Sequence, residues 1–127
     1  MNKLLLVALG GGLGALARYA LGIQSLKWLG SAWPYGTLLA NGLGGGLMGL
    51  LVGYLAFRGG ADQERLRLLL GVGGLGGFTT FSAFSLETAL MIERRAYGEA
   101  AGYALISVVL SILALFAGLI FARRVFG

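Results

Sequence analysis

The sequence has neither cysteine nor histidine, a single proline, and only 12% charged residues among its 127 positions. Without cysteine, disulfides, thiolate metal sites and thiol nucleophiles are excluded. Without histidine, the chain lacks the usual acid–base switch at neutral pH and the commonest metal ligand. Only five residues are acidic, and no two of them form a convincing catalytic pair. We therefore expect that the protein is not an enzyme.

Apolar residues and glycine dominate what is present. Hydrophobic residues make up 57% of the chain and the mean hydropathy is +0.85, which is typical of an all-α integral membrane protein. The 24 glycines allow helices to approach closely in lipid. The net charge of +5 is interpreted as basic residues flanking the lipid bilayer, so no nucleic-acid partner is expected.

Four apolar runs predict four transmembrane helices, at about 4–23, 35–57, 66–92 and 97–121. They use most of the chain, so we expect one membrane domain over residues 1–127. The first run is too long for the apolar part of a secretory signal and is predicted to span the membrane. Residues 24–34 are predicted to be a connection, and Pro34 to start the second helix.

The third apolar run contains an unusual stretch at residues 71–85. Its glycine run, 73–77, is unfavourable for an uninterrupted helix because each glycine costs about 1 kcal/mol relative to alanine. A break here frees backbone groups that need partners inside the protein. Hydroxyl groups and phenylalanines follow at once, and Phe81 and Phe84 share one face if the helix resumes there. This pattern indicates an ion pathway.

Several polar residues lie within the predicted spans, and each has two interpretations. Arg18 is either an interface residue, with its charge reaching water, or an anion-attracting group in a vestibule. Asn41, an amide deep in an apolar run, is either functional or a link between helices. Glu87 is either an acid at a pore mouth or a structural partner. The fourth span carries a polar stripe at steps of four residues, which either lines a pathway or packs locally: Tyr103, Ser107 and Ser111.

The basic residues give only a weak indication of orientation. Four spans place six basic residues on the side of the termini and four on the opposite side. This small difference permits insertion in either direction, and therefore a dimer of oppositely oriented copies.

These motifs resemble a known family, the small bacterial fluoride channels called CrcB or Fluc. The string Gly-Gly-Phe-Thr-Thr-Phe-Ser-Ala-Phe, which ends at Phe84, is highly specific for it. Further matching elements extend over nearly the whole chain: Gly-Gly-Leu-Gly-Ala15 with Arg18 and Tyr19, Gly36-Thr37-Leu38 with Asn41, Glu87, and the stripe of the fourth span.

The resemblance implies a fluoride-selective channel of the bacterial inner membrane that exports fluoride passively and protects against its toxicity. It implies an antiparallel, dual-topology homodimer with two pores, and a structural central Na⁺ held by the backbone carbonyls of Gly76 and Thr79. It also places Arg18 in a vestibule. The residues that match the pore, or whose hydroxyl can donate a hydrogen bond there, are Asn41, Thr80, Phe81, Ser82, Phe84, Tyr103, Ser107 and Ser111.

Two rival functions make different demands on the sequence. A proton-coupled multidrug exporter of four helices needs an acid within a membrane helix, and here the first span has none and Glu87 lies near the end of the third. A non-transporting scaffold accounts for the glycines as packing residues but leaves the Thr-Thr-Phe-Ser string unexplained.

Overall fold

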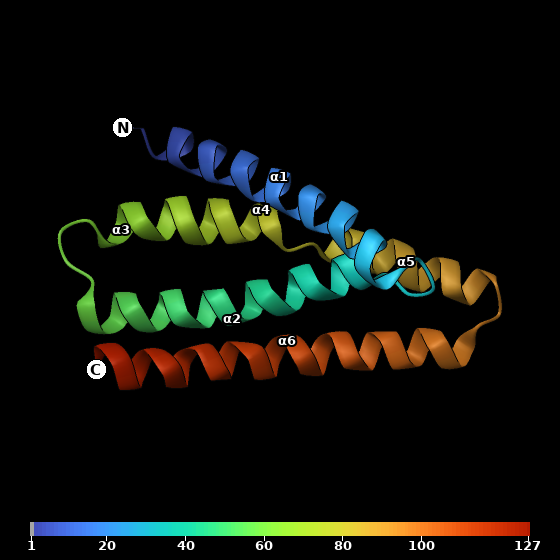
Figure 1. The fold of residues 1–127 in the computed structure, drawn as a ribbon. Helices are drawn as coiled ribbons and strands as arrows, with labels where there is room; N and C mark the ends of the chain where they lie inside the picture. The colour runs from blue at the N-terminus through green and yellow to red at the C-terminus, as the bar shows by residue number, and fades with distance from the viewer. Residues whose placement is uncertain (1) are drawn as a thin grey trace.

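The computed structural model describes residues 2–127, and this part of the chain is helical without β-strands. Four helical segments are long and apolar enough to cross a membrane. They run up and down beside one another (Figure 1). The four predicted spans are therefore present, while their boundaries differ from the prediction in three places.

The first helix, α1 (Lys3–Leu29), is longer than predicted. Its start is capped by Asn2, whose Oδ1 accepts a hydrogen bond from the Leu4 N–H at 2.7 Å. It ends at Gly30, whose φ of 80° lies in the left-handed region that favours glycine. The prediction that residues 24–34 form a connection was wrong for its first half, because nothing before Gly30 stops the helix.

The second and fourth spans start where the sequence predicted. Helix α2 (Tyr35–Arg58) begins directly after Pro34, and α6 begins after a turn in which Arg95 has a positive φ of 61°. Helix α6 (Tyr97–Phe126) continues past the predicted end at 121, so Arg123 and Arg124 belong to its last turn. Basic side chains at a helix C-terminus are favourable there because they face the negative end of the helix dipole.

The third span, Gln63–Glu93, consists of four pieces. It begins with α3 (Gln63–Leu66), continues as a widened π-type helix η1 (Arg67–Leu75), and ends its first half with α4 (Gly76–Phe78). After two extended residues, α5 (Phe81–Glu93) completes it. The expected break exists, but it follows the glycine run, which is itself helical.

Close helix packing explains why the glycine run stays helical. A Cβ atom added at Gly73 would lie 2.7 Å from the Val7 carbonyl oxygen, and one at Gly14 would collide with the carbonyl of Gly74. Glycine therefore lets η1 and α1 meet backbone to backbone, as small residues do in membranes. The packing gained at this interface offsets the low helix propensity of glycine.

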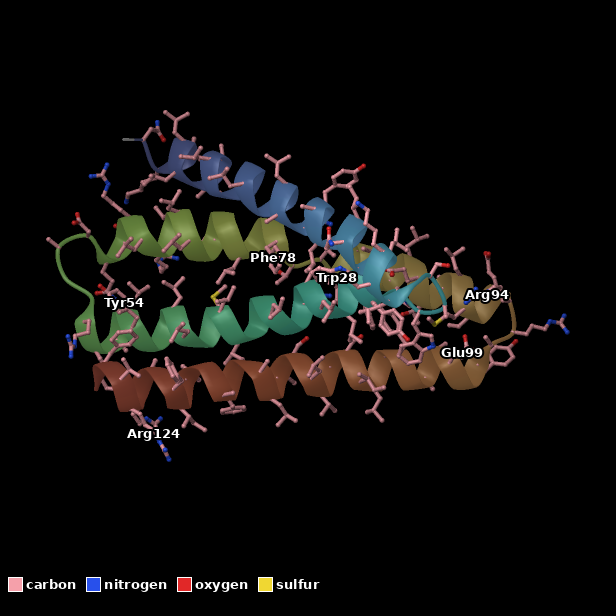
Figure 2. The ribbon with its side chains drawn as sticks, in the orientation of Figure 1. Trp28, Tyr54, Phe78, Arg94, Glu99 and Arg124 are labelled. Atoms are coloured by element: carbon pink, nitrogen blue, oxygen red, sulfur yellow. The ribbon has the colours of Figure 1, made fainter. Side chains whose placement is uncertain are left out.

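The most extensive contact joins α2 and α6, which also meet through glycines. Both termini and the α2–α3 connection lie at one end of the bundle (Figure 1). Tyr54 and Arg124 lie toward this end, and Arg94 and Glu99 toward the other (Figure 2). At the first end, Lys3 forms an exposed ion pair with Glu64 at 3.1 Å, which contributes little to stability.

Candidate functional site at the helix break

The break consists of Thr79 and Thr80, whose backbones are extended, with φ/ψ of −86°/156° and −150°/120°. The helix before it ends with a last backbone bond from the Thr79 N–H to the Leu75 carbonyl, at 2.9 Å. Extended residues cannot continue the helical ladder, so backbone groups on either side lose their ordinary partners. Within a membrane such groups need other partners in the protein.

Asn41 of α2 supplies partners for one of these residues. Its Oδ1 accepts a hydrogen bond from the Thr80 N–H at 2.7 Å, and its Nδ2 donates to the Thr80 carbonyl at 2.9 Å. One side-chain amide thus satisfies both backbone groups of one extended residue. The two interpretations of Asn41 are therefore not exclusive: it links two helices and also borders the cavity described below.

Thr80 in turn caps the helix that follows. Its Oγ1 accepts a hydrogen bond from the Ala83 N–H at 3.1 Å, as N-cap threonines do. In a continuous α-helix, the amide of Thr80 would bond the Gly76 carbonyl, and the amide of Ala83 the Thr79 carbonyl. Both amides are instead bonded to side chains. The carbonyls of Gly76 and Thr79 are thus left without their usual helical donors.

Beside the break, a cavity of about 390 Å³ opens between α2, α5 and α6. Most of the residues predicted for the pore line it, and no acidic side chain does. The lining includes Asn41, Thr80, Phe81, Phe84, Ser107 and Ser111, together with Thr79 and several apolar residues. An amide, hydroxyls and aromatic rings therefore surround one apolar space, with the helix break in its wall.

The phenylalanines are part of a chain of aromatic contacts. The ring centroids of Phe81 and Phe84 are 5.5 Å apart, and those of Phe84 and Tyr103 are 5.3 Å apart. Trp33 meets Tyr103 edge-on at 5.7 Å. Tyr103 is fully buried, whereas Phe81 is 78% exposed. The prediction that Phe81 and Phe84 lie on one face is confirmed by their contact.

Four of the predicted site residues do not line this cavity. Tyr103 lies behind Phe84, and its hydroxyl has no hydrogen-bond partner among residues 2–127. The Ser82 Oγ is exposed, 3.2 Å from the Thr80 Oγ1. Gly76 lies in the short helix before the break. Arg18 belongs to a different cavity.

This second cavity, of about 550 Å³, lies between α1, α2 and α5. Arg18 and Glu87 both line it, and the Thr37 hydroxyl donates to Glu87 Oε1 at 2.6 Å. Thr80 lines both cavities. The helix break thus stands between a space with charged groups and a space with neutral donors and rings.

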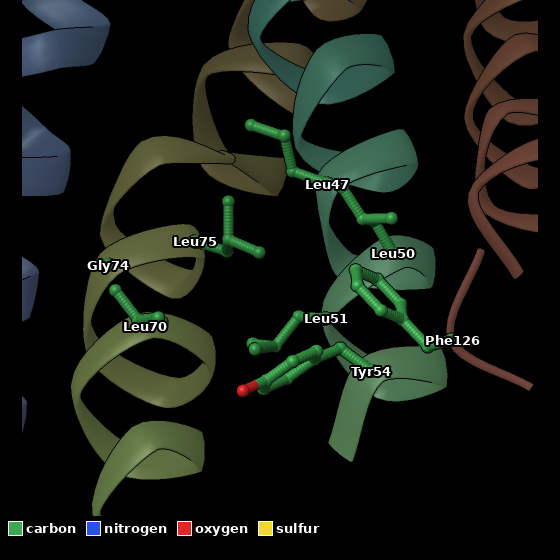
Figure 3. A pocket seen from close by; sticks show the side chains of 8 residues that line it. All are labelled: Leu47, Leu50, Leu51, Tyr54, Leu70, Gly74, Leu75 and Phe126. Carbon is green, nitrogen blue, oxygen red and sulfur yellow. The ribbon is translucent and has the colours of Figure 1, made fainter. Parts of the chain in front are cut away.

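A third, apolar cavity lies between α2, η1 and the end of α6 (Figure 3) and has a volume of about 400 Å³. Leucines form most of its wall, and the Tyr54 hydroxyl is the polar side-chain group that Figure 3 shows there. A small anion needs several converging donors to replace its water. This cavity therefore does not qualify as the ion site.

Sequence reasoning missed two residues of the site region as candidates in their own right. Thr37 bonds a carboxylate that lies 50 positions later in the chain. Trp33 lies in the predicted connection 24–34, yet it contacts Tyr103. Neither residue has a local pattern that reveals its partner, because each contact joins segments that lie at least 50 positions apart in the sequence.

Trp33 gives a prediction about stability. Replacing it with leucine is expected to destabilise the purified protein by about 1–2 kcal/mol, because an aromatic pair contributes roughly 0.5–1.5 kcal/mol beyond its buried area. Thermal unfolding in detergent measures this. Trp28, which is 72% exposed, is the matched control. If Trp28→Leu destabilises as much as Trp33→Leu, the contact with Tyr103 is not important.

Comparison with known proteins decides the family. The family model described as "CrcB-like protein, Camphor Resistance (CrcB)" matches residues 5–119. The chain belongs to this family. It is 71% identical over 126 residues to a protein of Phenylobacterium zucineum named fluoride-specific ion channel FluC, a match that covers 99% of both chains.

Two further relatives have the same name. A protein of Caulobacter sp. strain K31 is 65% identical, with 99% of this chain and 98% of the relative covered. One of Rhodopseudomonas palustris strain BisB5 is 54% identical, with 95% and 97% covered. These relatives are named as ion channels, so the prediction that the chain is not an enzyme is confirmed at the level of its family.

Proposed function

We propose that the protein is a fluoride-selective channel that lets F⁻ leave the cell across the bacterial inner membrane and so protects against fluoride toxicity. Membership of the CrcB family supports this, together with relatives named as fluoride-specific channels. The observation that carries it is the cavity at the helix break. Its wall combines neutral hydrogen-bond donors with two phenylalanine rings and has no acidic side chain.

The chemistry of that wall suits a small anion. Fluoride is strongly hydrated, so a pore must replace its water with donors. Asn41 Nδ2 has a second N–H beyond the one that it gives to Thr80, and the hydroxyls of Ser107 and Ser111 can donate. The edges of phenylalanine rings carry positive partial charge. Neutral donors bind weakly enough to release the ion, as conduction requires.

The direction of transport follows from the acid–base chemistry of the substrate. Uncharged HF enters the cell from an acidic medium and ionises in the less acidic interior. The resulting anion leaves passively, down its electrochemical gradient, so no coupling ion is needed. Arg18, in the second cavity, would raise the local concentration of anions at one mouth of the pathway.

We further propose that two copies of the protein form an antiparallel homodimer with two pores. Two features support it: the basic residues are nearly balanced between the two ends, and Phe81, beside the break, is 78% exposed on one protomer. A second copy, packed in the opposite orientation, would cover this ring and complete the wall of each pore.

The carbonyls of Gly76 and Thr79 fit a structural Na⁺ at the dimer centre. Their usual helical donors are bonded to Asn41 and Thr80, and backbone carbonyl oxygens suit a hard, desolvated cation. Two carbonyls from each copy would give four oxygens. The positive charge of such an ion would balance the partial negative charge of the carbonyl oxygens at the break. Because both copies would provide ligands, the ion would also hold them together.

Ion efflux from liposomes tests the function. Purified protein is reconstituted into vesicles loaded with fluoride and chloride, and electrodes for both ions record their release. We expect rapid loss of fluoride and retention of chloride. No fluoride loss from folded protein, with and without Na⁺, would contradict a channel and favour the scaffold. Efflux that requires a proton gradient would favour a coupled exporter.

A further inference from the structure

We propose that Asn41 is a positioning residue that holds the third span open and thereby keeps the Gly76 carbonyl available to the cation. This inference rests on the proposed function, because it concerns the Na⁺ assigned there. Asn41 would thereby connect the wall of the ion cavity with the cation site.

The link follows from competition for one amide. The Thr80 N–H has two possible acceptors: the Gly76 carbonyl in a closed helix, or the side chain of Asn41. It bonds Asn41 Oδ1 at 2.7 Å, while Asn41 Nδ2 satisfies the Thr80 carbonyl at 2.9 Å. Without this side chain, both groups of Thr80 would be unsatisfied, at about 1–3 kcal/mol each.

The third span can avoid this cost in free energy if its helix becomes continuous across Thr79 and Thr80. The Thr80 N–H would then return to the Gly76 carbonyl, and this oxygen would have less capacity for a cation. Thr80 controls the second oxygen in the same way, since its hydroxyl holds the Ala83 N–H at 3.1 Å, away from the Thr79 carbonyl. Each cation carbonyl therefore depends on one side chain.

The geometry of α2 keeps Asn41 in place. Gly44, one turn later, faces Thr79, and a Cβ atom there would collide with the Thr79 Cγ2. The absence of a side chain at Gly44 lets α2 approach the break closely enough for the amide to reach Thr80. The remaining N–H of Asn41 is free to face the ion cavity, so one residue serves both sites.

The test measures cation binding rather than ion flux. Purified wild type and Asn41→Leu are unfolded thermally in detergent over a series of Na⁺ concentrations, with choline replacing Na⁺ to keep the ionic strength constant. A ligand that binds only the folded state raises Tm with its concentration. We expect the Na⁺ concentration that gives half of the stabilisation to rise at least tenfold in Asn41→Leu.

Ser111→Ala is the matched control, because Ser111 lines the same cavity without a hydrogen bond to the break among residues 2–127. Its Na⁺ midpoint, which is the Na⁺ concentration that gives half of the stabilisation, should equal that of the wild type. Equal midpoints in wild type and Asn41→Leu would overturn the inference. So would a wild type whose Tm does not respond to Na⁺, whereas fluoride efflux from the same preparation decides the channel function separately.

A second variant covers the case in which Asn41→Leu does not fold. Thr80→Val keeps the shape of the side chain and the backbone bonds to Asn41 but removes the hydroxyl that holds the Ala83 amide. We expect its Na⁺ midpoint to rise at least threefold, because the Thr79 carbonyl regains its helical donor. An unchanged midpoint in folded Thr80→Val would overturn the inference by itself.

Discussion

Replacing Phe84 with isoleucine is expected to reduce fluoride efflux at least tenfold while the protein stays folded. Phe84 lines the cavity at the break and contacts both Phe81 and Tyr103, so its ring has a fixed position. Isoleucine keeps the site apolar but has no ring edge with positive partial charge. If fluoride loses about 1.4 kcal/mol of binding free energy beside this side chain, its occupancy there falls tenfold.

Fluoride efflux from liposomes, recorded with a fluoride electrode, measures this reduction. Leu86→Ile is the control, because Leu86 belongs to the same helix and is 60% exposed; its efflux should match the wild type. Phe81→Ile is expected to show a loss like that of Phe84→Ile. Wild-type rates in both phenylalanine variants would mean that the rings do not contribute to ion passage.

Replacing Gly118 with valine is expected to prevent formation of the folded protein. A Cβ atom at Gly118 would collide with the carbonyl oxygen of Gly46, and its next neighbours are also backbone atoms of α2. Backbone cannot rotate away as a side chain can. Overpacking typically costs about 1–3 kcal/mol and sometimes more, and this contact belongs to the most extensive helix pair of the fold.

Size-exclusion chromatography of the detergent-extracted protein and its Tm measure this effect. Gly102→Val is the matched control on the same helix, because nothing lies within 4 Å of a Cβ atom added at Gly102. We expect it to elute like the wild type. A monodisperse Gly118→Val with the Tm of the wild type would show that α2 and α6 can separate without cost.

The class of protein and the number of its spans were predictable from the sequence alone. Both follow from local properties: a membrane span needs about 20 apolar residues, and that requirement can be read without knowing its neighbours. The string around Phe81 and Phe84 also indicated the family. The contact between these two rings was predictable because residues three apart share a helix face.

The position of the break in the third span and the hydrogen bonds of Asn41 depend on contacts between helices and were not predictable. Local propensity placed the break in the glycine run 73–77, but those glycines pack against α1, and the chain opens at Thr79 and Thr80 instead. Asn41 meets Thr80 across 39 positions of sequence. Helix propensity describes a residue within its own helix. Here the position of the break depends on the backbone contacts with α1 and on the hydrogen bonds of the Asn41 amide from α2.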